Sequence, residues 1–194
     1  PEFSFLPRKF KIAVTGHEDD RAAVKVHDIG LVIRKDDKGA VGFEVLVGGG
    51  QGRTPMIAKT VRDFIPARDL LSYLEAILRT YNLVGRRDNK YKARIKIMVH
   101  ELGIEEVRRL VEEEWSRIRE GALVLPEEEV ARIRAFFAPP ALADVALPVR
   151  SYEVARFEDQ AFARWTRTNV VAHRQPGYGI AVISLKPTGG IPGD

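Results

Sequence analysis

Cysteine is absent from this chain of 194 residues. Its absence excludes disulfide bonds, thiolate metal sites and redox-active thiols within the chain. No apolar run approaches the roughly 20 residues that a membrane-spanning helix needs, so no membrane partner is expected. Residues 1–6 lack the features of a signal peptide, and the chain also lacks an initiator methionine. We therefore expect a processed or dissected chain that works in the cytoplasm.

Positive charge is in mild excess. The chain carries 31 Lys and Arg against 27 Asp and Glu, a formal net charge of +4. An excess of this size permits an anionic partner but does not require nucleic acid. The contents of 45% hydrophobic and 30% charged residues are those of an ordinary globular protein.

Two β-rich stretches flank a predicted hairpin turn. Residues 24–33 and 41–47 are β-branched and apolar, and Asp36-Asp37-Lys38-Gly39 between them is typical of a tight turn. A further strand is expected over residues 6–14, which contain Pro7 near their start. Helices are expected from Pro66 to about Gly85, within residues 90–102, over 104–120 and near 127–137. These elements predict an α/β (α+β) fold with a mixed sheet.

A proline-rich stretch marks the best candidate for a domain boundary. It covers residues 138–141, and Pro148 follows. Beyond it, residues 161–172 and 179–185 are predicted to be strands. We expect one domain over residues 1–125, a helical linker over 126–149 and a partial module over 150–194. Because the strands of this tail lack local partners, we expect it to pack on the first domain or to self-associate with another copy.

Two clusters of cations stand out. Arg8, Lys9 and Lys11 lie on the first expected strand, where the two lysines would share a face. A second cluster places six cations within eleven residues, with Asp88 as its one acid: Arg86, Arg87, Lys90, Lys92, Arg94 and Lys96. Like charges at helical spacing repel, and a polyanionic ligand would offset that repulsion through charge-assisted hydrogen bonds. A basic surface patch without a partner explains the pattern equally well.

A glycine cluster follows the second strand of the hairpin. It reads Gly48-Gly49-Gly50-Gln51-Gly52, and Arg53 adds a cation. Glycine lets backbone approach a ligand closely, and successive N–H groups can hold an anion. The cluster lacks the Lys-Ser/Thr ending of a phosphate-binding loop, and a flexible hairpin end accounts for it as well.

The histidines and acids indicate no metal site and no acid–base pair. No two of the four histidines show the spacing of paired metal ligands, and no Ser/His/Asp arrangement follows from the sequence. They are His17, His27, His100 and His173. The residues alone therefore indicate an α/β protein that binds a polyanion, without reaching a reaction.

Three segments together resemble the siroheme-dependent sulfite and nitrite reductase family, in its hemoprotein subunit. They are Leu6-Pro-Arg-Lys-Phe-Lys11, Gly42-Phe-Glu-Val-Leu-Val-Gly-Gly-Gly50 and the basic segment 85–96, in matching order and approximate spacing. The resemblance covers nearly all of the first 120 residues. Residues 150–190 resemble the opening of a ferredoxin-like module. The resemblance therefore implies an interior fragment, with a mixed-sheet siroheme-binding domain followed by the start of that module.

The resemblance also implies roles for particular residues. Lys9 and Lys11 are implied as catalytic residues that face the anionic substrate above the siroheme iron. The residues implied to bind siroheme are Arg8, Gly48, Gly49, Gly50, Arg87, Asn89, Lys92 and Arg94. The parent enzyme would use siroheme and a [4Fe–4S] cluster to reduce sulfite or nitrite by six electrons, with ferredoxin or a flavoprotein as the electron donor. Because the ligands of the cluster are absent here, the fragment alone is expected to be inactive.

Two other interpretations stay open. A non-catalytic polyanion-binding module would use the same cations for nucleic acid. Only Phe10 and Tyr91 are interleaved among those cations, which argues against a stacking platform and against nucleic acid as the partner. A structural module whose siroheme-type site has decayed is the third interpretation. Siroheme absorbance would separate the reductase fragment from the decayed structural module. A salt-dependent shift with oligonucleotides would support the nucleic-acid-binding module.

Overall fold

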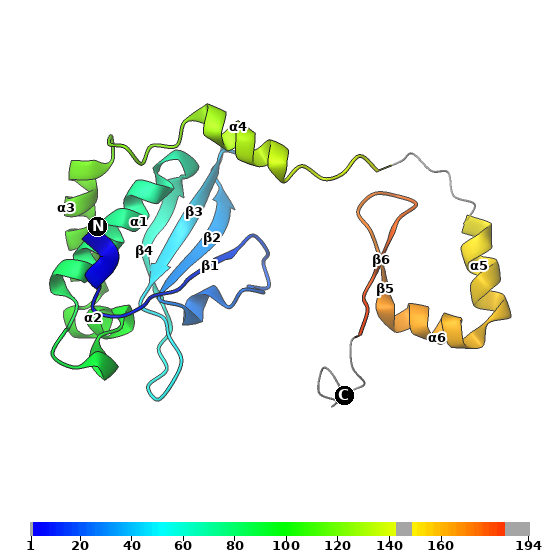
Figure 1. Ribbon diagram of the computed structural model, residues 1–194, viewed down its shortest axis with the longest axis horizontal. Coiled ribbons are helices and arrows are strands. Elements are labelled where there is room, and N and C mark those ends of the chain that lie inside the picture. Colours follow the sequence, from blue (N-terminus) through cyan, green and yellow to red (C-terminus); the bar gives the residue numbers. More distant parts are fainter. Residues whose placement is uncertain (1, 143–148, 185–194) are drawn as a thin grey trace. The chain divides into compact units, whose positions relative to one another are not determined.

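Four strands of the first half of the chain form one mixed sheet in the order β1-β2-β3-β4 (Figure 1). They are β1 (Ile12–Thr15), β2 (Ile29–Lys35), β3 (Val41–Val47) and β4 (Lys59–Pro66). β1 and β2 are parallel, whereas β2–β3 and β3–β4 are antiparallel. The computed structural model describes residues 2–142 and 149–184, and it divides into two units, Pro1–Phe137 and Ala138–Asp194. The mixed-sheet α/β fold expected from the sequence is confirmed.

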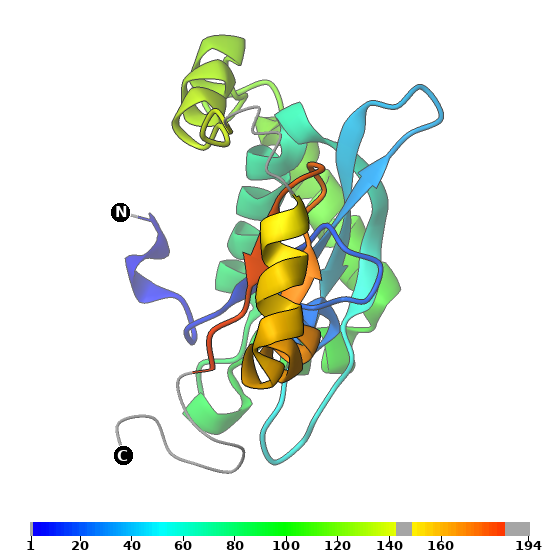
Figure 2. The ribbon, with the colours of Figure 1, turned by 90° about the vertical axis from the view of Figure 1, so that its right-hand side faces the viewer.

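The predicted hairpin between β2 and β3 is also confirmed. Asp36 Oδ1 accepts hydrogen bonds from the backbone nitrogens of Lys38 (2.9 Å) and Ala40 (2.8 Å). Gly39 adopts a positive φ of 81°, which glycine reaches without a steric penalty. Figures 1 and 2 show this turn at one end of the sheet and the β3–β4 loop at the other end.

Two strand predictions are wrong in their extent. β1 begins at Ile12 instead of residue 6, and the backbone nitrogen of Lys11 donates to Asp28 Oδ2 at 3.0 Å instead of to a strand carbonyl. β2 begins at Ile29 because the chain before it forms a 3-10 turn, η2 (Val24–Val26), which follows the left-handed Ala23 (φ 51°). β4 falls in a region to which no element was assigned.

Helices cover one face of the sheet, close to the predicted positions. They are α1 (Leu70–Val84), α2 (Ile95–Leu102) and α3 (Ile104–Ile118), and α4 (Glu127–Phe136) follows. Three further 3-10 turns are η1 (Glu2–Phe5), η3 (Ala67–Asp69) and η4 (Lys90–Lys92). The core is built from strand residues such as Ile29, Val45 and Val61 and from helix residues such as Ile77 and Val107. Burial of each large apolar side chain contributes about 1.5–3 kcal/mol, so this face carries most of the stability of the unit.

The second unit contains α5 (Val149–Glu158), α6 (Gln160–Asn169) and a hairpin of β5 (Val170–Ala172) with β6 (Gly179–Ala181). The strand predicted over residues 161–172 is wrong for most of its length. Asp159 Oδ1 accepts hydrogen bonds from the backbone nitrogens of Ala161 (2.8 Å) and Phe162 (3.0 Å), and this cap begins a helix. β6 starts where predicted but ends at Ala181.

Some predictions about this half of the chain stay predictions. Leu185, the terminal loop 186–190 and the Pro148 boundary lie outside the described residues. The division into residues 1–125, 126–149 and 150–194, and the association of the tail, also remain predictions.

Tyr81 links α1 to two other segments, the chain before β1 and the chain before α2. Its hydroxyl donates to the carbonyl oxygen of Ala93 at 2.6 Å and lies 3.1 Å from that of Arg8. Burial raises the pKa of Tyr81 from 10.0 to about 12. The raised pKa means that the folded state favours the neutral phenol, the form that donates the hydrogen bond.

We predict that Tyr81→Phe lowers the free energy of unfolding by about 1 kcal/mol at neutral pH, because the Ala93 carbonyl loses its donor. A raised folded-state pKa contributes stability that is fully present below pH 10 and is lost as pH rises toward 12. Urea unfolding across this window should therefore show a smaller loss of stability in the variant than in the wild type. Equal losses in both proteins would contradict the assignment.

A candidate anion-binding cavity

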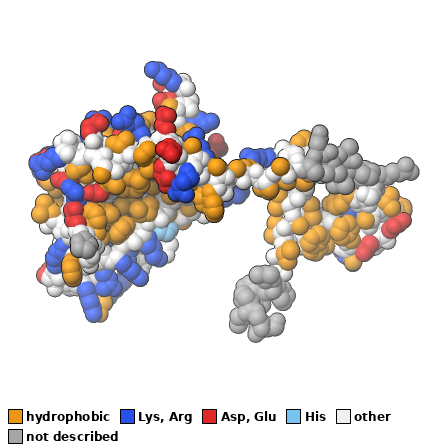
Figure 3. All heavy atoms as spheres, turned by 45° about the horizontal axis from the view of Figure 1, so that its top comes forward, with side chains coloured by type: hydrophobic (Ala, Val, Ile, Leu, Met, Phe, Trp, Pro, Cys, Tyr) orange, Lys and Arg blue, Asp and Glu red, His pale blue; other side chains and the backbone are white. Residues whose placement is uncertain are grey.

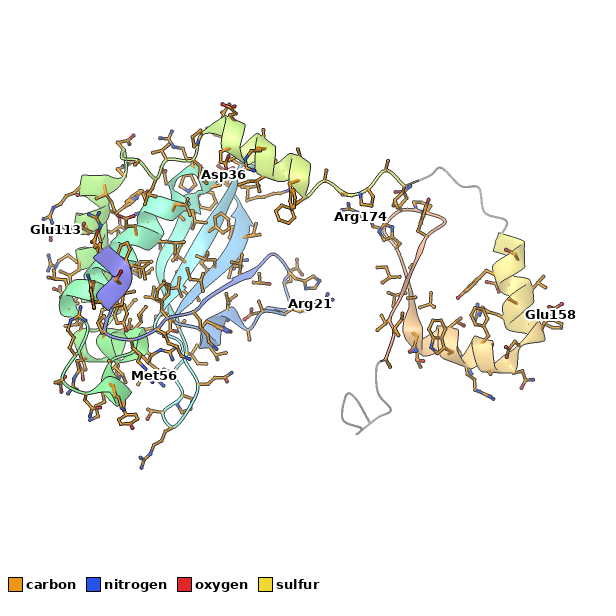
Figure 4. The ribbon with its side chains drawn as sticks, in the orientation of Figure 1. Arg21, Asp36, Met56, Glu113, Glu158 and Arg174 are labelled. Carbon is orange, nitrogen blue, oxygen red and sulfur yellow. The ribbon has the colours of Figure 1, made fainter. Side chains whose placement is uncertain are left out.

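A cavity of about 910 Å³ opens at the end of the sheet that carries the β3–β4 loop. Its lining comes from four separate segments: Lys9 and Lys11 before β1, residues 26–28 before β2, the loop within residues 50–56, and residues 91–101 around the start of α2. In Figure 4, Met56 marks this end of the sheet and Asp36 marks the opposite end. The volume is near the top of the range usual for ligand sites, so the cavity suits a large ligand.

The lining of this cavity is strongly basic. It contains two carboxylates, Asp28 and Glu101, and six cations: Lys9, Lys11, Arg53, Lys92, Arg94 and Lys96. Figure 3 shows Lys and Arg side chains gathered along the lower edge of the first unit. Both carboxylates already pair with arginines, Asp28 with Arg94 and Glu101 with Arg86. Within residues 2–142 and 149–184, the side chains of Lys9, Lys11, Arg53 and Lys92 make no ion pair or hydrogen bond.

Asp28 joins the walls of the cavity. Its side chain is only 1% exposed. Arg94 donates from Nε to Oδ1 (2.9 Å) and from Nη2 to Oδ2, and the backbone nitrogen of Lys11 donates to Oδ2 at 3.0 Å. The Asp28 carbonyl oxygen accepts from the Gly48 nitrogen at 2.9 Å. The hydrogen bonds that Arg94 donates to Asp28 raise the pKa of Arg94, so its guanidinium remains charged and paired with Asp28.

The glycine cluster serves close packing within the protein. Gly48 has a φ of 87°, and a Cβ there would lie 2.8 Å from the Val99 side chain. A Cβ on Gly49 would lie 2.5 Å from the carbonyl oxygens of Lys25 and His27. The atoms that approach Gly48 and Gly49 therefore belong to α2 and to the chain before β2, and only Gly50 lines the cavity.

Most cations of segment 86–96 are held by acceptors of the chain itself. Arg86 binds Asp88 (2.7 Å) and Glu101 (2.8 Å), and Arg87 donates to the carbonyl oxygens of Phe5 (2.9 Å) and Asn82 (2.7 Å). Arg94 binds Asp28, and Lys96 donates to two carbonyl oxygens of the β3–β4 loop. Internal partners thus offset much of the repulsion that the sequence suggested a ligand would offset.

The structure brings half of the predicted site residues to one cavity: Lys9, Lys11, Gly50, Lys92 and Arg94. The other five lie outside its lining: Arg8, Gly48, Gly49, Arg87 and Asn89. Asn89 supports it indirectly, because its Oδ1 accepts from the Tyr91 nitrogen (2.9 Å) and caps η4, which carries Lys92. Sequence reasoning gave no role to Asp28, because Lys25 and His27 beside it make the stretch look like an ordinary exposed polar segment.

Two absences apply to the part of the chain that the structure describes. No three His, Asp or Glu side chains of it lie together as metal ligands. No helix of it is long and apolar enough to cross a membrane.

Residues 1–119 match the family model described as the nitrite and sulphite reductase 4Fe-4S domain. The chain is 37% identical over 137 residues to a sulfite reductase (ferredoxin) of Synechococcus elongatus, covering 67% of this chain and 21% of that protein. It is 34% identical to a ferredoxin–nitrite reductase of Leptolyngbya laminosa, covering 67% and 25%. The structure of Mycobacterium tuberculosis NirA aligns with a TM-score of 0.55 at 28% identity, covering 60% of this chain and 21% of that one. The chain thus spans about a fifth to a quarter of the length of these relatives.

We predict that Asp28→Ala lowers the free energy of unfolding by about 2–4 kcal/mol, because it leaves Arg94 half-buried without a partner. The matched control is Asp88→Ala, which removes an exposed carboxylate from the same basic region and should leave stability close to that of the wild type. Urea unfolding at neutral pH measures both effects. An Asp28 variant as stable as the Asp88 variant would show that the cavity walls do not depend on this carboxylate.

Proposed function

This chain belongs to the nitrite and sulfite reductase family, and on that premise we propose that its cavity binds siroheme carboxylates and the oxyanion substrate. The observation that carries the proposal is the set of four cations in the cavity lining that have no acceptor among the described residues: Lys9, Lys11, Arg53 and Lys92. They come from three separate segments and meet at one cavity. We also propose that the chain is part of a longer reductase that converts sulfite or nitrite, with ferredoxin or a flavoprotein as donor.

The residues of the cavity fit a polycarboxylate such as siroheme. The volume of about 910 Å³ is large for a ligand site, and a free cation such as Lys92 can make a charge-assisted hydrogen bond to a carboxylate. Lys92 would hold the cofactor from the side of η4. Arg94 would support the site through Asp28, since its guanidinium already has a partner.

Bound siroheme would supply an iron centre through which electrons reach the substrate. The residues of this chain would bind and orient the anion. The ammonium groups of Lys9 and Lys11 would attract an oxyanion, and they would stabilise it more strongly as its oxygens gain electron density. The chain contains no cysteine, so thiolate ligands for a [4Fe–4S] cluster would come from elsewhere in the parent.

Nucleic acid fits the same cavity less well. Phe10 is partly buried against the core, and Tyr91, which is 79% exposed, is the one Phe, Tyr or Trp that the described residues contribute to the lining. Proteins that bind single strands without sequence preference rely on aromatic platforms in addition to cations. Binding of an oligonucleotide in preference to siroheme would favour this second function.

We predict that the full chain binds siroheme saturably, with an affinity that falls as salt rises, as followed by absorbance. In the siroheme-loaded chain, Lys9→Met and Lys11→Met should each weaken sulfite binding about 10–100-fold, because each removes a charged hydrogen bond. Both variants should keep the siroheme affinity of the wild type. Lys38→Met, in the turn at the opposite end of the sheet, is the matched control and should change neither affinity.

Two outcomes would contradict this assignment. Failure of the wild-type chain to bind siroheme would overturn the cavity as a cofactor site. Retention of wild-type sulfite affinity in both lysine variants would overturn the role of the lysines alone.

A further inference from the structure

We propose that Arg53 is a further cofactor-binding residue, which contacts a carboxylate of the tetrapyrrole, and that Lys96 is a positioning residue that fixes the loop carrying Arg53. This inference rests on the proposed function of the cavity and deepens it. It assigns separate tasks to two cations that line the same wall.

The β3–β4 loop is closed at its base by the backbone. The Gly50 nitrogen donates to the Met56 carbonyl oxygen at 2.9 Å, and the Met56 nitrogen donates to the Gly50 carbonyl oxygen at 2.8 Å. Gly52, with a φ of 92°, allows the turn beyond this closure. Arg53 follows it directly, so the loop presents its guanidinium to the cavity.

Lys96 fixes the part of the loop that the backbone closure does not reach. From α2, its Nζ donates to the carbonyl oxygens of Gln51 (3.0 Å) and Thr54 (2.5 Å), which flank Arg53 in the sequence. A Cβ on Gly50 would lie 2.8 Å from Lys96 Cδ, so the lysine stem also packs directly on the loop. Two of the three donors of this ammonium are thus used within the protein.

Arg53 differs from the other arginines of this region. Arg86, Arg87 and Arg94 are each held by carboxylate or carbonyl oxygens. Arg53 is exposed, lines the cavity and has no acceptor within residues 2–142 and 149–184. A guanidinium presents a planar fork of donors that matches a carboxylate in a bidentate geometry. The Arg53 guanidinium, which has no partner among the described residues and is carried by a fixed loop, therefore suits a carboxylate supplied by the ligand.

Siroheme titrations of the full chain test both assignments in a double-mutant cycle of Arg53→Gln and Lys96→Met. We expect Arg53→Gln to weaken siroheme binding about 10–100-fold, through loss of charged hydrogen bonds. Lys96→Met should weaken it less, and the double variant should bind as Arg53→Gln does, because a positioning residue acts only through the residue it positions. Lys96→Arg, which can still donate to the two carbonyl oxygens, should restore most of the affinity. The matched control is Lys38→Gln, which removes one exposed cation at the opposite end of the sheet and should leave siroheme binding unchanged.

Each alternative result has a defined meaning. Wild-type siroheme affinity in Arg53→Gln would overturn this inference and leave the proposed function standing, whereas absence of binding by the wild type would overturn the proposed function itself. Additive losses in the double variant would show that Lys96 meets the ligand directly and would overturn its positioning role. Weaker sulfite binding in siroheme-loaded Arg53→Gln, with siroheme affinity retained, would move Arg53 from the cofactor to the substrate.

Discussion

The cavity depends on one buried carboxylate. Asp28 is almost completely removed from solvent, and a buried charge is tolerated only when it is paired and hydrogen-bonded. Its partners are the guanidinium of Arg94 at the start of α2 and the backbone nitrogen of Lys11 before β1. Because Asp28 needs these partners, it holds the two basic segments of the sequence together. The cavity wall that carries the lysines therefore depends on this carboxylate.

The placement of charge matters more for this site than the amount. The second basic cluster contains six cations in the sequence, but carboxylates and carbonyl oxygens of the chain engage four of them: Arg86, Arg87, Arg94 and Lys96. Of these, Arg94 and Lys96 lie in the cavity walls, whereas Arg86 and Arg87 lie outside the lining. The four cations of the lining that have no partner among the described residues lie on three different segments and face one cavity. This arrangement suits a ligand with several anionic groups.

Features set by local chemistry could be predicted from the sequence. The hairpin turn follows from the Asp36 side chain and Gly39, and the helices from the spacing of apolar residues. The limits of β1 could not be predicted, because a side chain 17 residues away takes the Lys11 nitrogen. The start of α6 carries a local signal in the Asp159 cap, but the β-branched and aromatic residues of the stretch, such as Phe162 and Trp165, favoured a strand.

The candidate site was predictable only in part, for a related reason. The motif around Lys9 and Lys11 indicated an anion site, and the structure brings both to the cavity. Asp28 and Arg94, however, are 66 residues apart, and Lys96 reaches a carbonyl 42 residues before it. Contacts at such separations leave no periodic signal in a single sequence, so the residues that organise the cavity became evident only in three dimensions.

NMR mapping of siroheme on the isotopically labelled chain tests whether the three segments that carry the free cations form one ligand site. We expect the amide signals of residues 9–11, 50–56 and 91–96 to shift or broaden together as siroheme is added. The signals of the hairpin turn at residues 36–39, at the opposite end of the sheet, should stay unchanged. Perturbations confined to other surfaces, or to only one of the three segments, would show that the three segments do not form one ligand site.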